Sequence, residues 1–256
     1  MEKVISEQIG RVAKLALNRP AKANCLTEAL MAALQEALQS LEEDDSVSVV
    51  VITGNEHYFC AGADLEEMIG RRFGGSHRVD CLSDAWEAIF RFSKPLIAAV
   101  QGYAVGGGCE LVTGCDVVIA GESAQFGQPE ISVGTLPGLG GTQRLPRLIG
   151  RSRAMDWCLT GRLVSAQEAH TAGLVTQVLP DKAVLPAAMT YARQMSMFSL
   201  PVLKMIKASI KNVDEYPLSA GLVRERQWFY ASFDLHDRHE GMSAFVEKRT
   251  PRFEHR

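Results

Sequence analysis

The segment GYAVGGGCELVTGCD, residues 102–116, places three consecutive glycines two positions before an acidic side chain. It follows an apolar run typical of a buried strand and opens a run typical of a helix. Glycines at a helix start leave unpaired backbone N–H groups at the positive end of the helix dipole, and a ligand atom can approach them closely because no Cβ intervenes. Such a turn can hold a negatively charged atom next to the carboxyl group of Glu110.

Two phosphate-binding motifs share this arrangement of strand, glycines and helix, and neither fits the sequence. The dinucleotide pattern G-x-G-x-x-G fails at its sixth position from both Gly106 and Gly138. A P-loop requires Gly-Lys-Ser/Thr, which the sequence lacks, and Glu110 would repel a phosphate. A carbonyl that becomes negative during a reaction suits the turn better. The sequence therefore predicts an oxyanion hole, in which loss of one donor costs about 2.7–4 kcal/mol of transition-state stabilisation.

An oxyanion hole needs a second donor, and the segment YFCAGADLEEM, residues 58–68, offers one. It also follows a buried strand and opens a helix, through the small residues Ala61, Gly62 and Ala63. Taken singly, these features have ordinary explanations: glycine turns allow close packing, Glu110 complements a helix dipole, and Glu130 is a loop carboxylate. Their combination favours a catalytic site.

The periodicity of the chain predicts the elements that must position these residues. Strands are expected at 3–9, 11–17, 46–54, 94–102, 116–121, 123–127 and 174–178. Helices are expected at 26–44, with Thr27 as the N-cap, at 77–93 and through the glycine segment to Gly114, and they dominate from residue 138 onward. Alternating strands and helices imply parallel pairing, so the fold class is α/β with a helical last quarter.

Composition and charge exclude several classes of protein. The 256 residues are 46% hydrophobic and 22% charged, which is ordinary for a globular protein and argues against disorder. The apolar runs are too short to span a bilayer, and no leader pattern precedes them, so we expect a cytoplasmic protein without membrane contact. The net charge of −3 gives no support to nucleic-acid binding.

The cysteines and histidines do not form a metal-binding pattern. The six cysteines contain no Cys-x-x-Cys pair, so we expect reduced and mostly buried thiols. His236 and His239 are three positions apart, but no cysteine or third histidine lies near them in the sequence. We therefore expect no metal site.

Four segments together resemble the enoyl-CoA hydratase (crotonase) family, in the order and spacing of that family. They are LNRPAKANCLT (17–27), FCAGADLEEM (59–68), the highly specific block 94–150, and DRHEGMSAFVEKRTPRF (237–253). The resemblance runs essentially from end to end. It implies a crotonase-type spiral of ββα units over residues 1–195 and a C-terminal helical, trimer-forming region over 196–256, as a single functional unit. It also implies a homotrimer or a hexamer built from two trimers.

The resemblance also implies roles for individual residues. The backbone N–H groups of Ala63 and Gly107 would hold the thioester carbonyl of an acyl-CoA, and Glu110 and Glu130 would be the catalytic glutamates. The implied contacts to substrate and CoA are Lys22, Ala23, Ala61, Gly62, Asp64, Leu65 and Gly106, with Lys248 contributed by a neighbouring subunit. Close relatives often carry Lys where this chain has Glu66, and Lys22, Arg71, Arg72, Lys248 or Arg249 could replace that cation.

The chemistry implied is the syn addition of water to a 2-trans-enoyl-CoA, which gives a 3-hydroxyacyl-CoA. Water must reach C3, a proton must reach C2, and the charge on the thioester oxygen must be stabilised. Two carboxyl groups can share the first two tasks, each worth about 10²–10⁴ in rate. We assign water activation to Glu110 and protonation of C2 to Glu130. No cofactor is expected, because CoA is part of the substrate.

Several alternatives remain open at this point. Other crotonase chemistries are double-bond isomerisation, thioester hydrolysis and decarboxylation, and the presence of both glutamates favours hydration. An RNA-binding relative would need a basic surface bearing aromatic residues, whereas aromatic residues make up only 7% of the chain. The ending 237–253 is similar to hydratases of both fatty-acid and phenylacetate breakdown. Short straight-chain enoyl-CoA and 2,3-dehydroadipyl-CoA are therefore both candidates, selected by an acyl-pocket wall expected at 71–90 and in the C-terminal helices.

Overall fold

The computed structural model describes residues 3–70 and 80–256, with the backbone alone for 80–84. Its strands are β1 (Val4–Ile9), β2 (Val12–Leu17), β3 (Val49–Thr53), β4 (Tyr58–Cys60), β5 (Leu96–Val100), β6 (Tyr103–Val105), β7 (Val117–Gly121), β8 (Gln125–Gly127), β9 (Val164–Ser165) and β10 (Gln177–Leu179). Within the described ranges these strands form two sheets, ordered β1-β2-β3-β5-β7-β10 and β4-β6-β8-β9.

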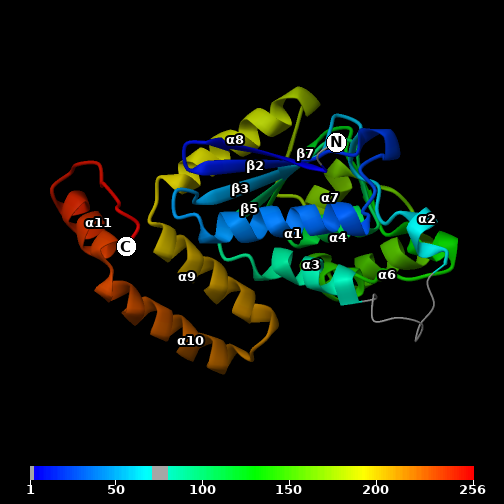
Figure 1. The fold of residues 1–256 in the computed structure, drawn as a ribbon. Coiled ribbons are helices and arrows are strands. Elements are labelled where there is room, and N and C mark those ends of the chain that lie inside the picture. Colours follow the sequence, from blue (N-terminus) through cyan, green and yellow to red (C-terminus); the bar gives the residue numbers. More distant parts are fainter. Residues whose placement is uncertain (1–2, 71–79) are drawn as a thin grey trace.

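The larger sheet is parallel from β2 to β10 and carries helices on both faces. Its helices and the others described are α1 (Glu28–Glu43), α2 (Leu65–Met68), α3 (Asp80–Arg91), α4 (Gly107–Thr113), α5 (Gly141–Ile149), α6 (Arg151–Thr160), α7 (Ala166–Ala172), α8 (Val184–Ser196), α9 (Leu200–Lys211), α10 (Leu218–Ala231) and α11 (His236–Val246). Helix α8 covers one face, whereas α1 and α3 lie on the other (Figure 1).

Strand β3 shows why this sheet needs cover on both faces. Successive side chains of a strand point to opposite faces, and all of β3 is buried. Val49 and Val51 pack in the cluster that includes Ala188 of α8, whereas Val50 and Ile52 pack in the cluster with the leucines of α1. A continuous β-branched run is the sequence pattern that such a doubly covered parallel strand requires.

The smaller sheet is the part of the fold that leads to the two glycine-rich turns. Strand β4 ends at Cys60, immediately before the first turn, and β6 ends at Val105, immediately before the second. These strands pair in parallel, with Tyr58 opposite Tyr103 and Cys60 opposite Ala104. The ends of parallel strands lie at the same edge of a sheet, so this pairing brings the two turns together.

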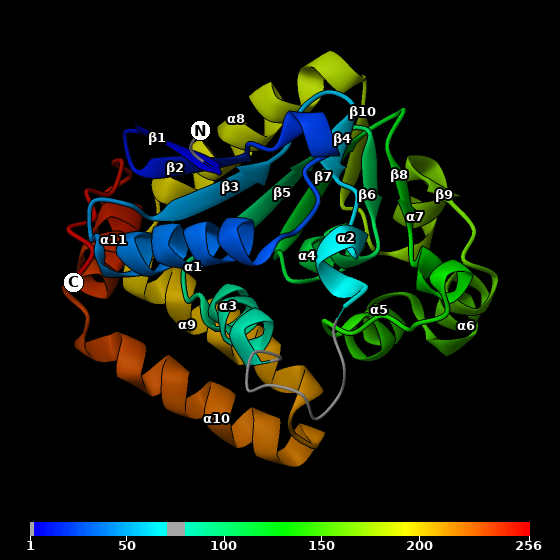
Figure 2. The same cartoon turned by 45° about the vertical axis from the view of Figure 1, so that its right-hand side comes forward.

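The C-terminal helices lie apart from the sheets. Helix α9 runs beneath α1 and α3, and α10 and α11 stand farther out, as Figures 1 and 2 both show. None of the helices that the structure describes combines the length and apolar character needed to cross a bilayer.

Most expected elements are confirmed. The antiparallel pair β1–β2 turns near Gly10, and the Thr27 hydroxyl accepts a hydrogen bond from the Leu30 N–H at 3.1 Å as the cap of α1. The strand expected at 174–178 is instead β10, at 177–179, and β4, β6 and β9 were not expected. The part 77–79 of the expected helix and the loop 71–77 lie outside the described residues. The division at residue 195 stays a prediction.

Candidate active site

The two glycine-rich turns touch each other. A Cβ built on Gly62 would lie 3.4 Å from the backbone nitrogen of Gly107, and one built on Gly107 would lie 3.7 Å from the nitrogen of Ala63. Ala63 also forms an isolated parallel bridge with Leu26, which ties the first turn to the start of α1. The two backbone amides predicted to form the oxyanion hole are therefore neighbours.

Both of these amides are free to donate. In the bridge, the Leu26 N–H donates to the Gly62 carbonyl at 2.8 Å and the Asp64 N–H donates to the Leu26 carbonyl at 3.0 Å, which leaves the Ala63 N–H directed away from Leu26. Gly107 is the first residue of α4, where an N–H has no partner within its own helix. Within residues 3–70 and 80–256, neither N–H has a hydrogen-bond acceptor. Two free donors on adjacent turns are what an oxyanion hole requires.

Glycine is required in the second turn for two different reasons, one at Gly106 and another at Gly108. Gly106 has φ +54°, a left-handed conformation that disfavours other residues, and it caps α4. Gly108 packs against the preceding turn so tightly that a Cβ would lie 2.1 Å from the Cys60 carbonyl oxygen. Backbone conformation and close packing together explain why side chains are missing here.

Glu110 lies in the first turn of α4, and only 1% of its surface is exposed. Its Oε1 accepts hydrogen bonds from the N–H groups of Leu139 at 2.8 Å and Gly141 at 2.7 Å. Burial raises the pKa of Glu110, while these two donors and the charge of Arg144 act in the opposite direction. The Glu110 carboxyl is thus fixed in orientation through one of its two oxygens.

Glu130 lies next to the same turns, in a 3₁₀ helix (Pro129–Val133), and its Oε1 is 3.1 Å from the position of a Cβ on Gly106. Burial, followed by the negative charge of Glu110, raises the pKa of Glu130 to about 7. Such a carboxyl group can carry a proton near neutral pH. Two glutamates with raised pKa values in one small site are suited to acid–base chemistry, and only Glu110 is held by main-chain N–H groups of the loop 138–141.

Gln128 is a site residue that the sequence reasoning missed. Its side chain is fully buried beside Glu130. With its amide nitrogen facing the carboxyl group, Gln128 donates hydrogen bonds to both oxygens of Glu130, at 3.1 and 3.2 Å. Its position two residues before Glu130 in FGQPE was the available signal, but spacing alone does not reveal burial. The loop 138–141 holds Glu110, a role that the sequence did not predict: its glycines fail the dinucleotide-binding pattern, and the segment was otherwise expected only to open the helical part of the chain.

The residues predicted to contact CoA in the first turn lie together. The Ala61 N–H donates to the Ala23 carbonyl at 3.0 Å, which joins the segment 19–24 to this turn. Asp64 caps α2 by accepting from the Glu66 N–H at 3.0 Å and pairs with Arg19 at 2.6 Å, and Leu65 is half exposed at the start of α2. Asp64 therefore has a structural role whether or not it contacts a ligand.

Among the described residues, three cations were proposed to replace the lysine missing at Glu66, and none of them is an unpaired cation at this site of its own chain. Lys22 forms an exposed ion pair with Glu66 itself, at 3.0 Å. Lys248 follows α11, at the opposite end of the molecule from α2 (Figure 1), so it does not reach the site of its own chain. Arg249 is paired with Glu240 at 2.6 Å. Arg71 and Arg72 lie outside the described residues.

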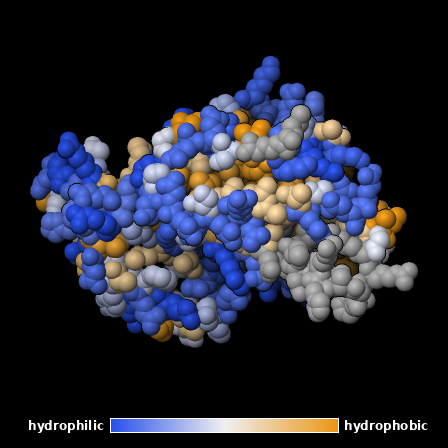
Figure 3. Space-filling view, viewed as in Figure 1, coloured by the Kyte–Doolittle hydropathy of each residue, from blue (hydrophilic) through white to orange (hydrophobic). Residues whose placement is uncertain are grey.

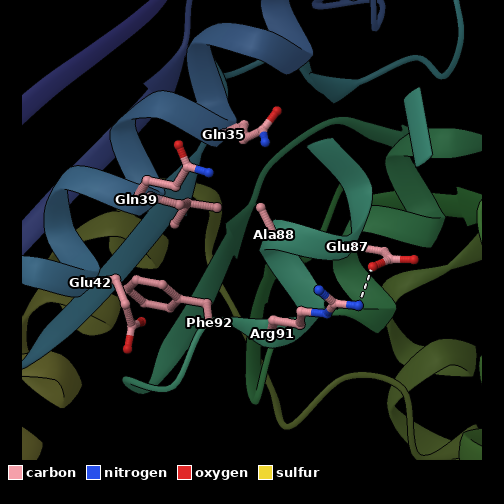
Figure 4. A pocket seen from close by; sticks show the side chains of 8 residues that line it. Gln35, Gln39, Glu42, Glu87, Ala88, Arg91 and Phe92 are labelled. Carbon is pink, nitrogen blue, oxygen red and sulfur yellow. Dashed lines mark ion pairs between the residues drawn. The ribbon is translucent and has the colours of Figure 1, made fainter. Parts of the chain in front are cut away.

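A separate cavity of about 400 Å³ opens between α1 and α3 (Figure 4). It is lined by Gln35, Leu38, Gln39, Glu42, Glu87, Ala88, Arg91 and Phe92. None of the predicted catalytic or CoA-binding residues lines this cavity. Two of its charged residues, Glu87 and Arg91, form an ion pair with each other at 2.5 Å. Glu110 and Glu130 lie at the two glycine-rich turns and not at this cavity, so we locate the candidate active site at the turns.

Comparisons with known proteins agree with this geometry. The model of the enoyl-CoA hydratase/isomerase family matches residues 7–256. The chain is 46% identical to a 2,3-dehydroadipyl-CoA hydratase of Escherichia coli (strain K12), over 100% of both chains. It is 45% identical to a probable mitochondrial enoyl-CoA hydratase of Dictyostelium discoideum, over 96% of this chain and 88% of the relative. An enoyl-CoA hydratase structure from Bacillus anthracis superposes with a TM-score of 0.94 at 39% identity, covering 99% of this chain and 100% of that one.

The raised pKa of Glu130 leads to a prediction about stability. Folding disfavours the ionised form, so the wild-type protein loses stability as the pH rises from the unfolded-state pKa toward about 7. Glu130→Gln lacks this titration. Its melting temperature should therefore exceed that of the wild type by a few degrees at pH 8, and the difference should shrink toward pH 4.5. Circular dichroism melts across this range measure it.

The matched control is Glu122→Gln, which changes an exposed carboxyl group. Its melting temperature should follow that of the wild type at every pH. A Glu130→Gln difference that stays constant from pH 4.5 to 8 would contradict the assignment of a raised pKa to Glu130.

Proposed function

The chain belongs to the enoyl-CoA hydratase/isomerase family, and we propose that it adds water across the C2=C3 double bond of a 2-trans-enoyl-CoA. The enzyme is an enoyl-CoA hydratase that forms a 3-hydroxyacyl-CoA without a further cofactor. One observation supports this most directly. Two glutamates with raised pKa values, one buried and one half-buried, lie beside two free backbone N–H groups on touching turns.

The site divides the reaction between its groups. The N–H groups of Ala63 and Gly107 hold the thioester oxygen and stabilise the negative charge that develops there. Glu110, with one oxygen held by two amides, accepts a proton from water as the water oxygen bonds to C3. Glu130, whose pKa is about 7, gives its proton to C2 on the same face of the double bond. The proton must then return from Glu110 to Glu130, and the two carboxyl groups titrate as a coupled pair.

Hydration is supported over the other reactions of the family by the presence of both carboxyl groups. Isomerisation moves a proton between carbons and does not need a second group to activate water. Thioester hydrolysis would use the same two amides to hold the carbonyl oxygen, but with water directed at the carbonyl carbon instead of C3. These reactions remain the alternatives that an assay must separate.

The acyl group is the less defined part of the substrate. One relative at 46% identity is named for 2,3-dehydroadipyl-CoA, whereas others at 43–45% are named only for enoyl-CoA. We propose a role in fatty-acid or aromatic-acid breakdown in the cytoplasm. Short straight-chain and ω-carboxylated enoyl-CoA are the two classes to compare.

We also propose that the protein works as a homotrimer or a hexamer. The C-terminal helices carry apolar side chains that are each more than half exposed, which are Leu218, Val223, Phe229, Tyr230, Phe245 and Val246. Small orange areas are visible among blue ones at the lower left of Figure 3, where these helices lie. Exposed apolar residues on two successive helices are suited to an interaction surface, and a second copy covering it would carry Lys248 toward another chain.

Replacing either glutamate should abolish most of the turnover. Glu110→Gln and Glu130→Gln should each lower kcat by about 10²–10⁴, because each removes one acid–base group. Acyl-CoA binding should survive, because neither change touches the Ala63 or Gly107 amides. Loss of ultraviolet absorbance by crotonyl-CoA and by 2,3-dehydroadipyl-CoA measures turnover, and calorimetry measures binding. Near-full activity in either variant would contradict the proposed roles.

Gly106→Ala should impair catalysis more than stability. A Cβ there would lie 3.1 Å from Glu130 Oε1 and would displace that carboxyl group, so kcat should fall by about tenfold or more. Gly10→Ala is the matched control, because φ is +59° at Gly10 and nothing lies within 4 Å of its Cβ position. Both should lose about 1–2 kcal/mol of stability in urea unfolding, but Gly10→Ala should keep wild-type kcat. Equal kcat values would argue against the contact.

The proposed assembly depends on the exposed C-terminal apolar surface. Phe229→Glu buries a charge in any interface there and should shift the mass measured by light scattering from that of a trimer or hexamer to that of a monomer. Ser40→Glu places the same charge at an exposed position of α1 and should leave the mass unchanged. A wild-type protein that is monomeric at micromolar concentration would reject the assembly.

A further inference from the structure

The loop that holds the Glu110 carboxyl group is itself held through one carbonyl. Leu139 and Gly141 supply the two N–H groups on Glu110 Oε1. Between them, Gly140 has φ +104°, a conformation that lets both amides point to the same oxygen. Any shift of this loop therefore moves the catalytic carboxyl group.

Two side chains from separate elements meet at the Leu139 carbonyl. The indole N–H of Trp86, on α3, donates to this oxygen, and Nη1 of Arg144, on α5, donates to it at 3.3 Å. Leu139 is thus fixed on both sides, with its N–H on Glu110 and its C=O on Trp86 and Arg144. A carbonyl with two donors is held more firmly than one with a single partner.

The two donors are also packed against each other through Phe90. The guanidinium of Arg144 lies 3.2 Å from the centre of the Phe90 ring, and the rings of Trp86 and Phe90 are 5.7 Å apart in an edge-on arrangement. Lys211 of α9 donates to the Phe90 carbonyl at 2.7 Å and ties the end of α3 in place. Trp86 is only 4% exposed, so this contact is protected from water.

Helix α3 therefore faces two different environments. Trp86 contacts the loop that holds Glu110 and Phe90 contacts Arg144 of α5. Glu87, Ala88 and Arg91 instead line the cavity between α1 and α3 (Figure 4). The hydrogen bonds from Trp86 and Arg144 to the Leu139 carbonyl therefore connect α3 and α5 to the loop that holds Glu110.

We infer that Trp86 and Arg144 are positioning residues for catalysis, which fix Glu110 by holding the Leu139 carbonyl between α3 and α5. The inference rests on the proposed function, because it takes Glu110 as the group that activates water. Neither side chain is assigned a contact with the substrate. Both act through the loop, and Arg144 adds a positive charge that favours the ionised form of Glu110.

Trp86→Phe and Arg144→Met test this role. Trp86→Phe keeps an aromatic ring beside Phe90 but removes the N–H, and Arg144→Met keeps a long side chain but removes both donor and charge. Each should lower kcat by about ten- to a hundredfold, with KM changed less than threefold. Weaker amide contacts and a lost charge raise the pKa of Glu110. The acid limb of the kcat/KM profile should therefore move to higher pH, by about half a unit or more in Arg144→Met.

Two further variants separate positioning from general stability. Arg144→Lys retains the charge, so its acid limb should move less than that of Arg144→Met. Arg91→Met removes an arginine from the cavity side of α3 and breaks the ion pair with Glu87, but should keep wild-type kcat and pH limits. A lowered melting temperature with wild-type pH limits in Trp86→Phe and Arg144→Met would overturn the inference, as would kcat within twofold of the wild type.

A readout without turnover keeps this test independent of the proposed reaction. Carbon-13 NMR of labelled glutamate, with Glu110→Gln for assignment, should show Glu110 titrating at higher pH in Arg144→Met than in the wild type. If the wild type shows no hydration but this shift is present, the proposed function fails and the positioning of Glu110 stands. An unshifted Glu110 signal overturns the positioning role.

Discussion

The site depends on one constraint: the carboxyl groups of Glu110 and Glu130 are both removed from water and lie close together. An ionised carboxylate loses hydration when it is buried, and two such charges repel each other, so both cannot be ionised without compensation. Glu110 receives that compensation from two backbone N–H groups and a nearby guanidinium. Burial, and after it the charge of Glu110, raises the pKa of Glu130 to about 7. Identical side chains thus become one group suited to accept a proton and one suited to give it.

The backbone supplies the donors to the substrate oxygen and to Glu110, whereas the side chain of Gln128 donates to Glu130. Every donor assigned to a negatively charged oxygen in the mechanism is a main-chain N–H, from Ala63 or Gly107 toward the substrate and from Leu139 or Gly141 toward Glu110. A main-chain donor is fixed once the turn around it is fixed, which avoids the entropy lost in ordering a long side chain. The short parallel pairing of β4 with β6 fixes the first two turns, and α3 and α5 fix the loop.

The parts of this site that depend on residue type could be predicted from the sequence. Contacts between residues far apart in the chain could not. Three glycines before Glu110 are by themselves explained by close packing, and they indicate a main-chain donor only in combination with the second glycine-rich turn and the two glutamates. The strands β4, β6 and β9 are two or three residues long, too short to show a period, so the sheet that joins the turns could not be predicted. Trp86 is an ordinary apolar residue of a helix until its N–H is seen on the Leu139 carbonyl, 53 positions away. Likewise, Lys22 was predicted as a CoA contact, and its pairing with Glu66 becomes visible only in the structure.

The pair formed by Lys22 and Glu66 bears on how the chain could bind a polyanion such as CoA. A lysine beside an exposed glutamate presents little net positive charge, and screening by salt weakens what remains. Binding of CoA phosphates therefore needs a cation from outside this pair. Lys248 follows exposed apolar residues of α11, and α10 and α11 project away from the sheets that form the site. In the proposed trimer or hexamer, this end of the chain would carry a cation to a neighbouring site, so that assembly and substrate binding would be one requirement.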